Sequence, residues 1–298
     1  MRHLSKFLTA LAILCLLVGF AAAEEITLMT PVPQAPELRL HQISNGSTDC
    51  YLVTCGDFVM LVDCGENTSI HNSNSKRLFG YLDAYGIDHV DIHLVTHWHD
   101  DHAYNIPQIN ERYGGENTIV FGTSAELPER FGPLQHGVYR QLRDGDRVQA
   151  GPVELLCVGP EESDLSGEFN KHSLNVVMYY QSHRFLFTGD WVDGTVVKRH
   201  EEELNRIDVL SFPHHGLTPM CIRPYTMRVL SPRVILVPGG GGSEDKVKDF
   251  VFHECSVKRM PRFYSNRDGH VHVIVRGNEL RTAYHVTPGE YPAGKLAP

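Results

Sequence analysis

Residues 96–102, Thr-His-Trp-His-Asp-Asp-His, place three imidazoles and two carboxylates directly after an apolar run. That run, residues 90–95, alternates and is rich in β-branched side chains, so it predicts a buried strand. The cluster therefore lies where a strand ends, the edge at which α/β sheets bind ligands. A bound cation would stabilise ionisable groups that lie this close together. Imidazole and carboxylate groups are ligands suited to zinc, manganese or iron. A histidine-rich surface loop is the plain alternative in a chain with 18 histidines.

The spacing inside this cluster divides it between two metals. His97 and His99 are two residues apart on an extended segment, so both side chains point the same way and can coordinate one ion. Asp101 and His102 follow where the chain turns into a helix, and they can face a second ion beside the first. Four ligands this close in sequence cannot complete two coordination shells. Further ligands must therefore come from other parts of the chain.

The first 23 residues form a segment of a different kind. Arg2 and Lys6 make a short basic head, an apolar stretch runs from Phe7 to Phe20, and three alanines precede Glu24. This pattern is typical of a secretory signal peptide, and the apolar stretch is short for a membrane span. An uncleaved N-terminal anchor is the alternative. We expect a secreted or extracytoplasmic protein whose mature chain has no membrane span.

Composition and charge narrow the class of protein. With 298 residues, 42% of them hydrophobic and 21% charged, the chain has an ordinary globular make-up. Its formal net charge is −9, or −11 without Arg2 and Lys6. An acidic surface repels polyanions, so tight binding to nucleic acid is not expected. Six cysteines remain beyond the signal peptide, and this even number permits disulfides without specifying a pairing.

Periodicity and turn signals divide the chain beyond the signal peptide into a linker (24–37), a single domain (38–276) and a C-terminal tail (277–298). Predicted strands are 38–43, 50–54, 58–63, 90–95, 118–121, 147–150, 153–158, 174–180, 184–188, 209–212, 234–237, 262–264 and 271–275. Predicted helices are 69–85, 103–113, 201–205 and 245–252. Two strand-rich halves with interspersed helices indicate an α/β protein in which two sheets pack together with helices outside.

Three later segments place polar or metal-binding residues next to predicted strands. They are Thr188-Gly189-Asp190, Pro213-His214-His215-Gly216 and Asn170-Lys171-His172-Ser173. Each is common by itself, since Gly-Asp usually forms a turn and a histidine pair can lie in a solvated loop. In a chain that already needs further ligands, their position at strand ends gives them a predicted role.

In this order, His-x-His-x-Asp-His, Thr-Gly-Asp and His-His-Gly resemble the motifs of the metallo-β-lactamase-fold hydrolases. Residues 46–53 and 61–65 are similar to that fold's opening hairpin and its Asp-x-Gly turn. Coverage runs from about residue 38 to 276. The resemblance is closest to the branch with the extracellular hydrolase domain of DNA-uptake competence proteins, although Leu217 stands where that branch often has serine. It implies a four-layer αβ/βα sandwich with two metals at one edge of its strands.

The same resemblance implies a ligand set for two divalent cations, with zinc preferred and manganese or iron as alternatives. The implied metal ligands are His97, His99, Asp101, His102, His172, Asp190 and His214. Asp190 would bridge the two ions, and His214 or His215 would complete the second site. His172 is preferred over Asn170 for the first site, because imidazole binds zinc better than an amide does.

The predicted reaction uses a metal-bound hydroxide formed near neutral pH. Asp101 would orient the hydroxide and accept its proton. The histidine of the 214–215 pair that is free of metal, assigned here to His215, would contact a phosphoryl oxygen or protonate the leaving group. Asp63 and Asp193 would be outer partners that orient ligand histidines.

The leading interpretation is therefore an exported metal-dependent hydrolase that acts on phosphodiesters or related phosphoesters. A β-lactamase or lactonase on the same fold is one alternative for a small-molecule substrate, and a catalytically inactive metal-binding module is another. The sequence leaves open the natural substrate, the metal, the disulfide pairing and the oligomeric state.

Overall fold

A computed structural model describes the chain between residues 35 and 290, with gaps. The described ranges are 35–46, 48–66, 74–161, 169–192, 194–217, 221–239, 246–247, 250 and 261–290. The predicted signal peptide, most of the predicted linker and most of the predicted helix 245–252 lie outside these ranges. No helix in the described part of the chain is long and apolar enough to cross a lipid bilayer.

Eight strands form one sheet, called sheet A below. In spatial order they are β15 (Glu279–Ala283), β14 (Val271–Arg276), β1 (Leu38–Gln42), β2 (Cys50–Cys55), β3 (Phe58–Asp63), β4 (Ile92–Leu94), β5 (Ile119–Gly122) and β6 (Val138–Gln141). Pairing is antiparallel from β15 to β3 and parallel from β3 to β6. The change occurs at β3 because a tight turn joins β2 to β3, whereas β3 reaches β4 through helix α2 (Asn74–Ala84).

Seven strands form the second sheet, called sheet B. In spatial order they are β13 (Arg262–Tyr264), β12 (Val234–Val237), β11 (Val209–Ser211), β10 (His183–Phe187), β9 (Asn175–Tyr180), β8 (Val153–Gly159) and β7 (Arg147–Ala150). Strands β7 to β10 pair antiparallel, and β10 to β13 pair parallel. The parallel crossovers contain helices α5 (Gly194–Arg199), α6 (Glu201–Leu204) and α7 (Pro224–Leu230). Sheet B therefore repeats the plan of sheet A.

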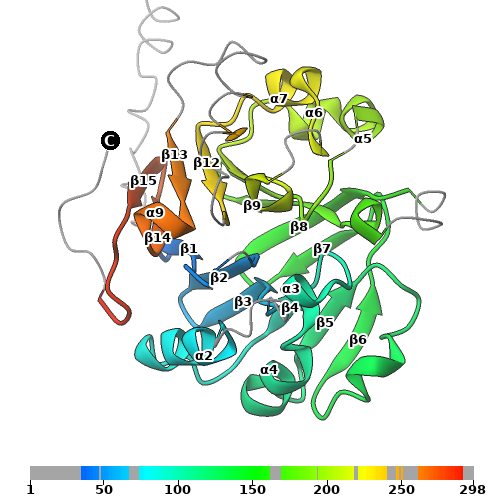
Figure 1. Cartoon of the computed structure of the whole chain (residues 1–298), viewed down its shortest axis with the longest axis vertical. Coiled ribbons are helices and arrows are strands. Elements are labelled where there is room, and N and C mark those ends of the chain that lie inside the picture. The colour runs from blue at the N-terminus through cyan, green and yellow to red at the C-terminus, as the bar shows by residue number, and fades with distance from the viewer. Residues whose placement is uncertain are drawn as a thin grey trace, which may run out of the picture. The chain divides into compact units, whose positions relative to one another are not determined.

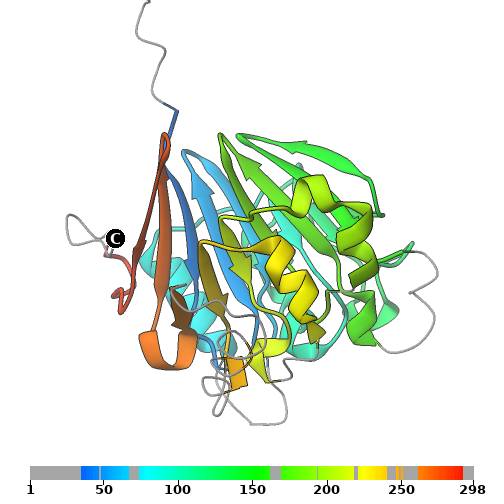
Figure 2. The same cartoon turned by 90° about the horizontal axis from the view of Figure 1, so that it is seen from above.

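The two sheets face one another across a shared apolar core. Leu40 and Met60 of sheet A and Val176 and Phe185 of sheet B belong to this one buried cluster. A second cluster joins the outer face of sheet B to α5, α6 and α7, and a third joins the outer face of sheet A to α2 and α4 (Ile106–Tyr113). Figure 1 shows these helices on opposite sides of the paired sheets, and Figure 2 shows the strands from above. The predicted four-layer αβ/βα sandwich is confirmed.

Every predicted strand is present to within two residues at each end, because strand alternation is encoded locally. The predicted helix 103–113 is instead two helices, α3 (Asp100–Ala103) and α4. Pro107 lies in the first turn of α4, where its missing N–H leaves no helical hydrogen bond unmade. The sequence patterns did not predict α5, α7, β6 or β15, all of which are present in the structure.

The strand β15 extends sheet A beyond the predicted domain end. It pairs with β14 through the two-residue turn Gly277-Asn278, with Arg276 opposite Glu279. Gly277 has a φ of 59°, the left-handed conformation that such hairpin turns require. The predicted tail, 277–298, therefore begins with a paired strand, and the Gly-Asn dipeptide was the signal for it.

Candidate metal centre

Side chains from both sheets converge where β3, β4, β10 and β11 end. They are Asp49 and Asp63, which flank the β2–β3 hairpin; His97, His99, Asp101 and His102, which follow β4; Asp190, which follows β10; and His214 and His215, which follow β11. Parallel strands present their carboxyl ends at one edge of a sheet, so the connections after them meet there. The structure thus brings together residues that are up to 166 positions apart in the sequence.

Asp190 lies at the middle of this convergence. Its Oδ2 atom is 3.7 Å from Nε2 of His97 and 3.7 Å from Nε2 of His214. Its Oδ1 atom is 3.1 Å from Nε2 of His102 and 3.7 Å from Nε2 of His215. Each oxygen of one buried carboxylate therefore faces a different pair of imidazoles.

Two groups of three side chains in the described part of the chain can each hold a cation. The first comprises His97, His99 and Asp190, and the second comprises Asp49, His102 and His215. Within each group the candidate ligand atoms lie within 4.8 Å of one another. In the first group, Nε2 of His97 is 3.1 Å from Nδ1 of His99. The pair that sequence spacing assigned to one ion is thus side by side.

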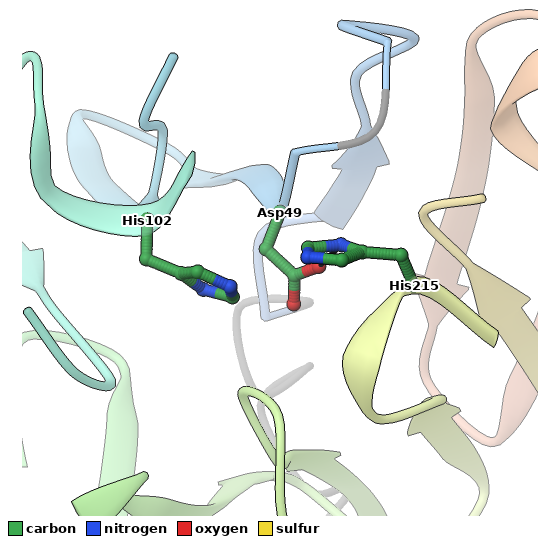
Figure 3. A group of neighbouring side chains, drawn as sticks. All are labelled: Asp49, His102 and His215. Atoms are coloured by element: carbon green, nitrogen blue, oxygen red, sulfur yellow. Dashed lines mark ion pairs between the residues drawn. The ribbon is translucent and has the colours of Figure 1, made fainter. Parts of the chain in front are cut away.

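In the second group each imidazole lies beside a carboxylate, and Figure 3 shows Asp49 beside His215. Nδ1 of His102 hydrogen-bonds to Oδ2 of Asp63 at 2.9 Å, whereas Nδ1 of His215 lies 2.9 Å from Oδ1 of Asp49 without hydrogen-bond geometry. This contact leaves Nε2 of each ring directed toward Asp190, and Nε2 of His215 is also 3.0 Å from Oδ2 of Asp101. Histidine ligands of metals are commonly held in this way, with one nitrogen on a carboxylate and the other on the ion.

Asp63 is held in place by the segment that carries the histidine cluster. Thr96 donates its backbone N–H to Oδ1 of Asp63 and its hydroxyl to Oδ2, at 2.7 and 2.9 Å. Two residues later, Gly65 permits a close approach of chains, since a Cβ atom there would lie 2.2 Å from the backbone nitrogen of His102. The Asp-x-Gly turn therefore fits against the cluster only with glycine at this position.

The electrostatics of the centre fit a bound cation. Burial disfavours the charged forms of His102 and His215, yet nearby carboxylates, Asp190 foremost, raise the pKa of His102 well above its usual value and that of His215 to about 10. Nε2 of His102 and Oδ1 of Asp190 are buried and approach to 3.1 Å at an angle that makes no hydrogen bond among the described atoms. Buried polar atoms normally have partners, and a divalent cation would supply one to both.

Ser173 contacts two residues of the first group. Its hydroxyl accepts the backbone N–H of Asp190 at 3.0 Å and lies 3.4 Å from Nδ1 of His97. His172 ends a short 3-10 helix, Phe169–His172, and belongs to neither candidate group found within the described ranges. Asp193, predicted as an outer partner, lies outside those ranges.

His214 and His215 occupy different environments despite being neighbours. The side chain of His215 is 3% exposed, whereas that of His214 is 28% exposed. Nδ1 of His214 lies 3.2 Å from Sγ of Cys221, and its Nε2 faces Asp190. Both residues have a φ of 54°, a left-handed conformation that turns successive side chains in different directions. The buried ring is therefore enclosed by carboxylates, whereas the other ring is partly exposed.

Sequence reasoning missed three residues of this centre: Asp49, Ser173 and Cys221. Asp49 is 1% exposed at the start of β2. A buried carboxylate beside a strand rarely lacks a partner, so its polarity next to the apolar run of β2 was the available signal. Ser173 and Cys221 carry no comparable signal, because their contacts depend on which loops meet.

Comparisons with known proteins agree with this geometry. The family model described as the Metallo-beta-lactamase superfamily matches residues 43–239. A Bacillus subtilis (strain 168) protein named Probable metallo-hydrolase YhfI is 33% identical over 125 residues, covering 39% of this chain and 45% of that protein. A Fuscovulum blasticum protein named Hydroxyacylglutathione hydrolase is 33% identical over 126 residues, covering 42% of this chain and 43% of that protein. The matches thus span less than half of each relative.

Two crystal structures show the same fold. That of the metallo-beta-lactamase fold protein YhfI from Bacillus subtilis has a TM-score of 0.53 at 16% identity, covering 76% of this chain and 95% of that chain. That of a putative metal-dependent hydrolase from Parabacteroides distasonis has a TM-score of 0.50 at 15% identity, covering 77% and 93%. Because the family model covers well over half of its length, the chain belongs to the metallo-β-lactamase superfamily.

Proposed function

We propose that this protein is an exported hydrolase that uses two divalent cations, zinc in the first instance, to cleave phosphodiesters or related phosphoesters. The observation that carries the proposal is the position of Asp190. Its two oxygens face two separate groups of imidazoles at 3.1 to 3.7 Å, as a carboxylate shared by two ions must.

The second ion would be held by Asp101, His102, Asp190 and His215. His215 suits a ligand role better than His214, because it is buried, its Nδ1 contacts Asp49 and its Nε2 points inward. This is the reverse of the assignment made from sequence, where the choice was open.

The first ion would be held by His97, His99 and Asp190, which leaves coordination positions for water and substrate. We leave His172 out of this set because it belongs to neither group of converging ligand atoms among the described residues. A site with three protein ligands and open positions is the arrangement expected of catalysis rather than of a structural metal.

When bound, such cations polarise a substrate oxygen and lower the pKa of a coordinated water. The side chain of Asp101 is 27% exposed at the centre, so its carboxylate can orient the attacking water and accept its proton. The thiol of Cys221 can donate to Nδ1 of His214, which places the ring hydrogen on Nε2. His214 would then donate to a phosphoryl oxygen.

The preference for phosphoesters rests on the resemblance to the competence-protein branch. The segments of this chain that carry that resemblance are 170–173, 213–216, 232–237 and 266–269. Export rests on the predicted signal peptide. Acyl-group hydrolysis is a second candidate, favoured by the 33% identity to a protein named Hydroxyacylglutathione hydrolase. Phosphoester hydrolysis requires attack at phosphorus, whereas acyl-group hydrolysis requires attack at a carbonyl carbon. A panel of substrates of both kinds therefore distinguishes the two activities.

The test is turnover by purified protein whose zinc or manganese content is known from elemental analysis. Hydrolysis of bis-p-nitrophenyl phosphate, lost in Asp101→Ala and kept in Asp100→Ala, would support the proposal. Asp100 is a matched control because it is adjacent in sequence but pairs with Arg130 at the surface. Metal-loaded protein that leaves the phosphodiester intact while cleaving nitrocefin, a lactone or a thioester would transfer the assignment to acyl chemistry. Metal-loaded protein inactive on the whole panel would favour a binding module.

A further inference from the structure

Two cysteines lie directly behind the second ligand group. Cys50 begins β2, Cys64 follows the last residue of β3, and each is 1% exposed. Their Sγ atoms are 3.0 Å apart. We infer that Cys50 and Cys64 form a disulfide bond in the mature protein, a modification site that ties the two outer carboxylates of the metal centre together.

The backbone already holds these sulfur atoms in register. Cys50 is paired with Asp63 in the β2–β3 ladder, and the N–H of Cys64 donates to the carbonyl of Asp49 at 2.8 Å. Regular alternation would place Cys64 on the face opposite Cys50, but the left-handed conformation of Asp63 and Cys64 returns the Cys64 side chain to the same buried cluster. A disulfide has a sulfur–sulfur distance of about 2.05 Å, so bond formation needs an approach of only about 1 Å.

Three other cysteines in the described ranges have sulfur contacts with nitrogen or oxygen atoms. Sγ of Cys55 lies 3.9 Å from the carbonyl of Pro36, Sγ of Cys157 lies 3.2 Å from that of Gly159, and Sγ of Cys221 lies 3.2 Å from His214. Among the five cysteines in the described ranges, the sulfur-to-sulfur contact is that of Cys50 with Cys64. Pairing is thus specified by the tertiary structure, although sequence spacing did not specify it.

The position of this pair gives the bond a consequence for the site. Cys50 is covalently next to Asp49, which contacts His215, and Cys64 is next to Asp63, which contacts His102. Asp63 and Cys64 have φ values of 59° and 84°, so the chain holds a left-handed conformation there. A covalent bond across the hairpin would restrict the relative movement of both carboxylates and oppose relaxation of that turn.

Bond formation balances as a thiol–disulfide exchange. Each thiol gives up one proton and one electron as the sulfur–sulfur bond forms. A small external disulfide takes up the two protons and two electrons and becomes two thiols. Because the apolar cluster that includes Leu78 and Tyr81 of α2 covers both sulfur atoms, exchange is expected during folding, before that helix packs. An oxidising compartment would provide the external disulfide.

The test refolds the purified chain from denaturant with a mixture of oxidised and reduced glutathione, and in parallel with excess dithiothreitol. Free thiols are then alkylated and the chain is digested for mass analysis. We expect a linked peptide pair containing Cys50 and Cys64 in the first sample, two hydrogens lighter than the sum of its parts and absent from the second. Alkylation of both residues after oxidative refolding, or linkage of either one to another cysteine, would overturn the inference.

A second measurement compares denaturant midpoints of the two refolded samples. The oxidised wild-type chain should unfold at the higher midpoint, because a closed loop restricts the unfolded state. The difference should vanish in Cys50→Ala/Cys64→Ala and persist in Cys157→Ala, which removes a buried thiol that has a backbone partner. Persistence of the difference in the double variant would contradict the assignment. If that variant fails to fold, the wild-type peptide map decides alone. Formation of the bond in the cell rests on the proposed export, but neither readout depends on turnover, so the result is independent of the proposed reaction.

Discussion

Among the single residues that the structure describes, Asp190 is the one whose carboxylate faces imidazoles of both ligand groups. It is 1% exposed, and its position is fixed by a backbone N–H bond to Ser173 and by the turn at Gly189. A Cβ atom at Gly189 would lie 2.6 Å from the hydroxyl of Thr96, so the turn needs glycine. The carboxylate is therefore presented to both groups by a rigid turn.

Replacement of Asp190 by asparagine should weaken both cation sites together. The amide removes the shared negative charge and replaces one ligand oxygen with a nitrogen that carries hydrogens. We expect turnover to fall by more than about 100-fold, beyond the usual effect of losing an outer partner. Elemental analysis after dialysis, with Asp144→Asn as a surface control, measures the metal content. Full retention of metal in Asp190→Asn would contradict the bridging role.

Asp49 offers a graded test at the same scale. An asparagine at position 49 still presents an oxygen to Nδ1 of His215, whereas an alanine does not. We expect Asp49→Asn to lower metal affinity by about 10-fold and Asp49→Ala by about 100-fold, the range found for outer partners of ligand histidines. Competition with a chromogenic chelator measures both. Equal and complete loss in the two variants would instead make Asp49 a direct ligand.

At the scale of elements, β1, β14 and α2 enclose a histidine–tyrosine cluster away from the metal centre. His41 and His272 are opposite one another in the β1–β14 register, and both rings contact the hydroxyl of Tyr81 at 2.9 Å. Burial is the main cause that lowers the pKa of His272 to about 3, assisted by Arg39 and His270, and burial also lowers that of His41. These imidazoles are neutral in the folded protein at neutral pH.

The cluster should make the fold sensitive to acid. The pKa of a histidine in the unfolded chain is about 6.5. Below that pH the unfolded state therefore binds a proton that His272 in the folded protein does not bind. Its contribution to stability is therefore constant above about pH 6.5 and falls by about 1.4 kcal/mol per pH unit below it. In His272→Gln, the loss of unfolding free energy between pH 7 and pH 5 should be smaller by about 2 kcal/mol. Urea unfolding at both values measures this, and equal losses in both proteins would refute it.

At the scale of the whole molecule, the metal centre connects the two sheets. His97 and His102 follow a strand of sheet A, whereas Asp190 and His215 follow strands of sheet B. Ions bound between them would join the sheets at one edge of the sandwich, in addition to the apolar core between their inner faces. Folding and metal binding are therefore expected to be linked.

Chelation should lower the thermal stability of the whole domain. A ligand that binds only the folded state stabilises it by about 2.7 kcal/mol when its free concentration is 100 times the dissociation constant. We expect a lower Tm in excess chelator than in excess zinc, with recovery when zinc is restored. Asp190→Asn provides the comparison, since its Tm should respond less to either treatment. An identical Tm for the wild-type protein in both conditions would argue against ions between the sheets.

Local sequence patterns predicted every strand except β6 and β15, the packing of two sheets with helices outside, and a set of candidate ligands. Alternation and turn residues are local properties, so β3 and β12 were predicted with their observed bounds. The residues His97 to His102 follow β4 in a fixed spacing, and that spacing decided which of them lie together. Short helices such as α5 and α7 were missed because a helix of six or seven residues depends on packing rather than on its own propensity.

The contacts between side chains of the two sheets could not be predicted from local sequence. His214 and His215 are equivalent in sequence, and it is the contact with Asp49 across the sandwich that distinguishes them. The same packing places Ser173 against His97 and brings Cys50 to Cys64. The physical reason is that sequence spacing encodes the local direction of a side chain, whereas its partner depends on the register and packing of strands distant in the chain.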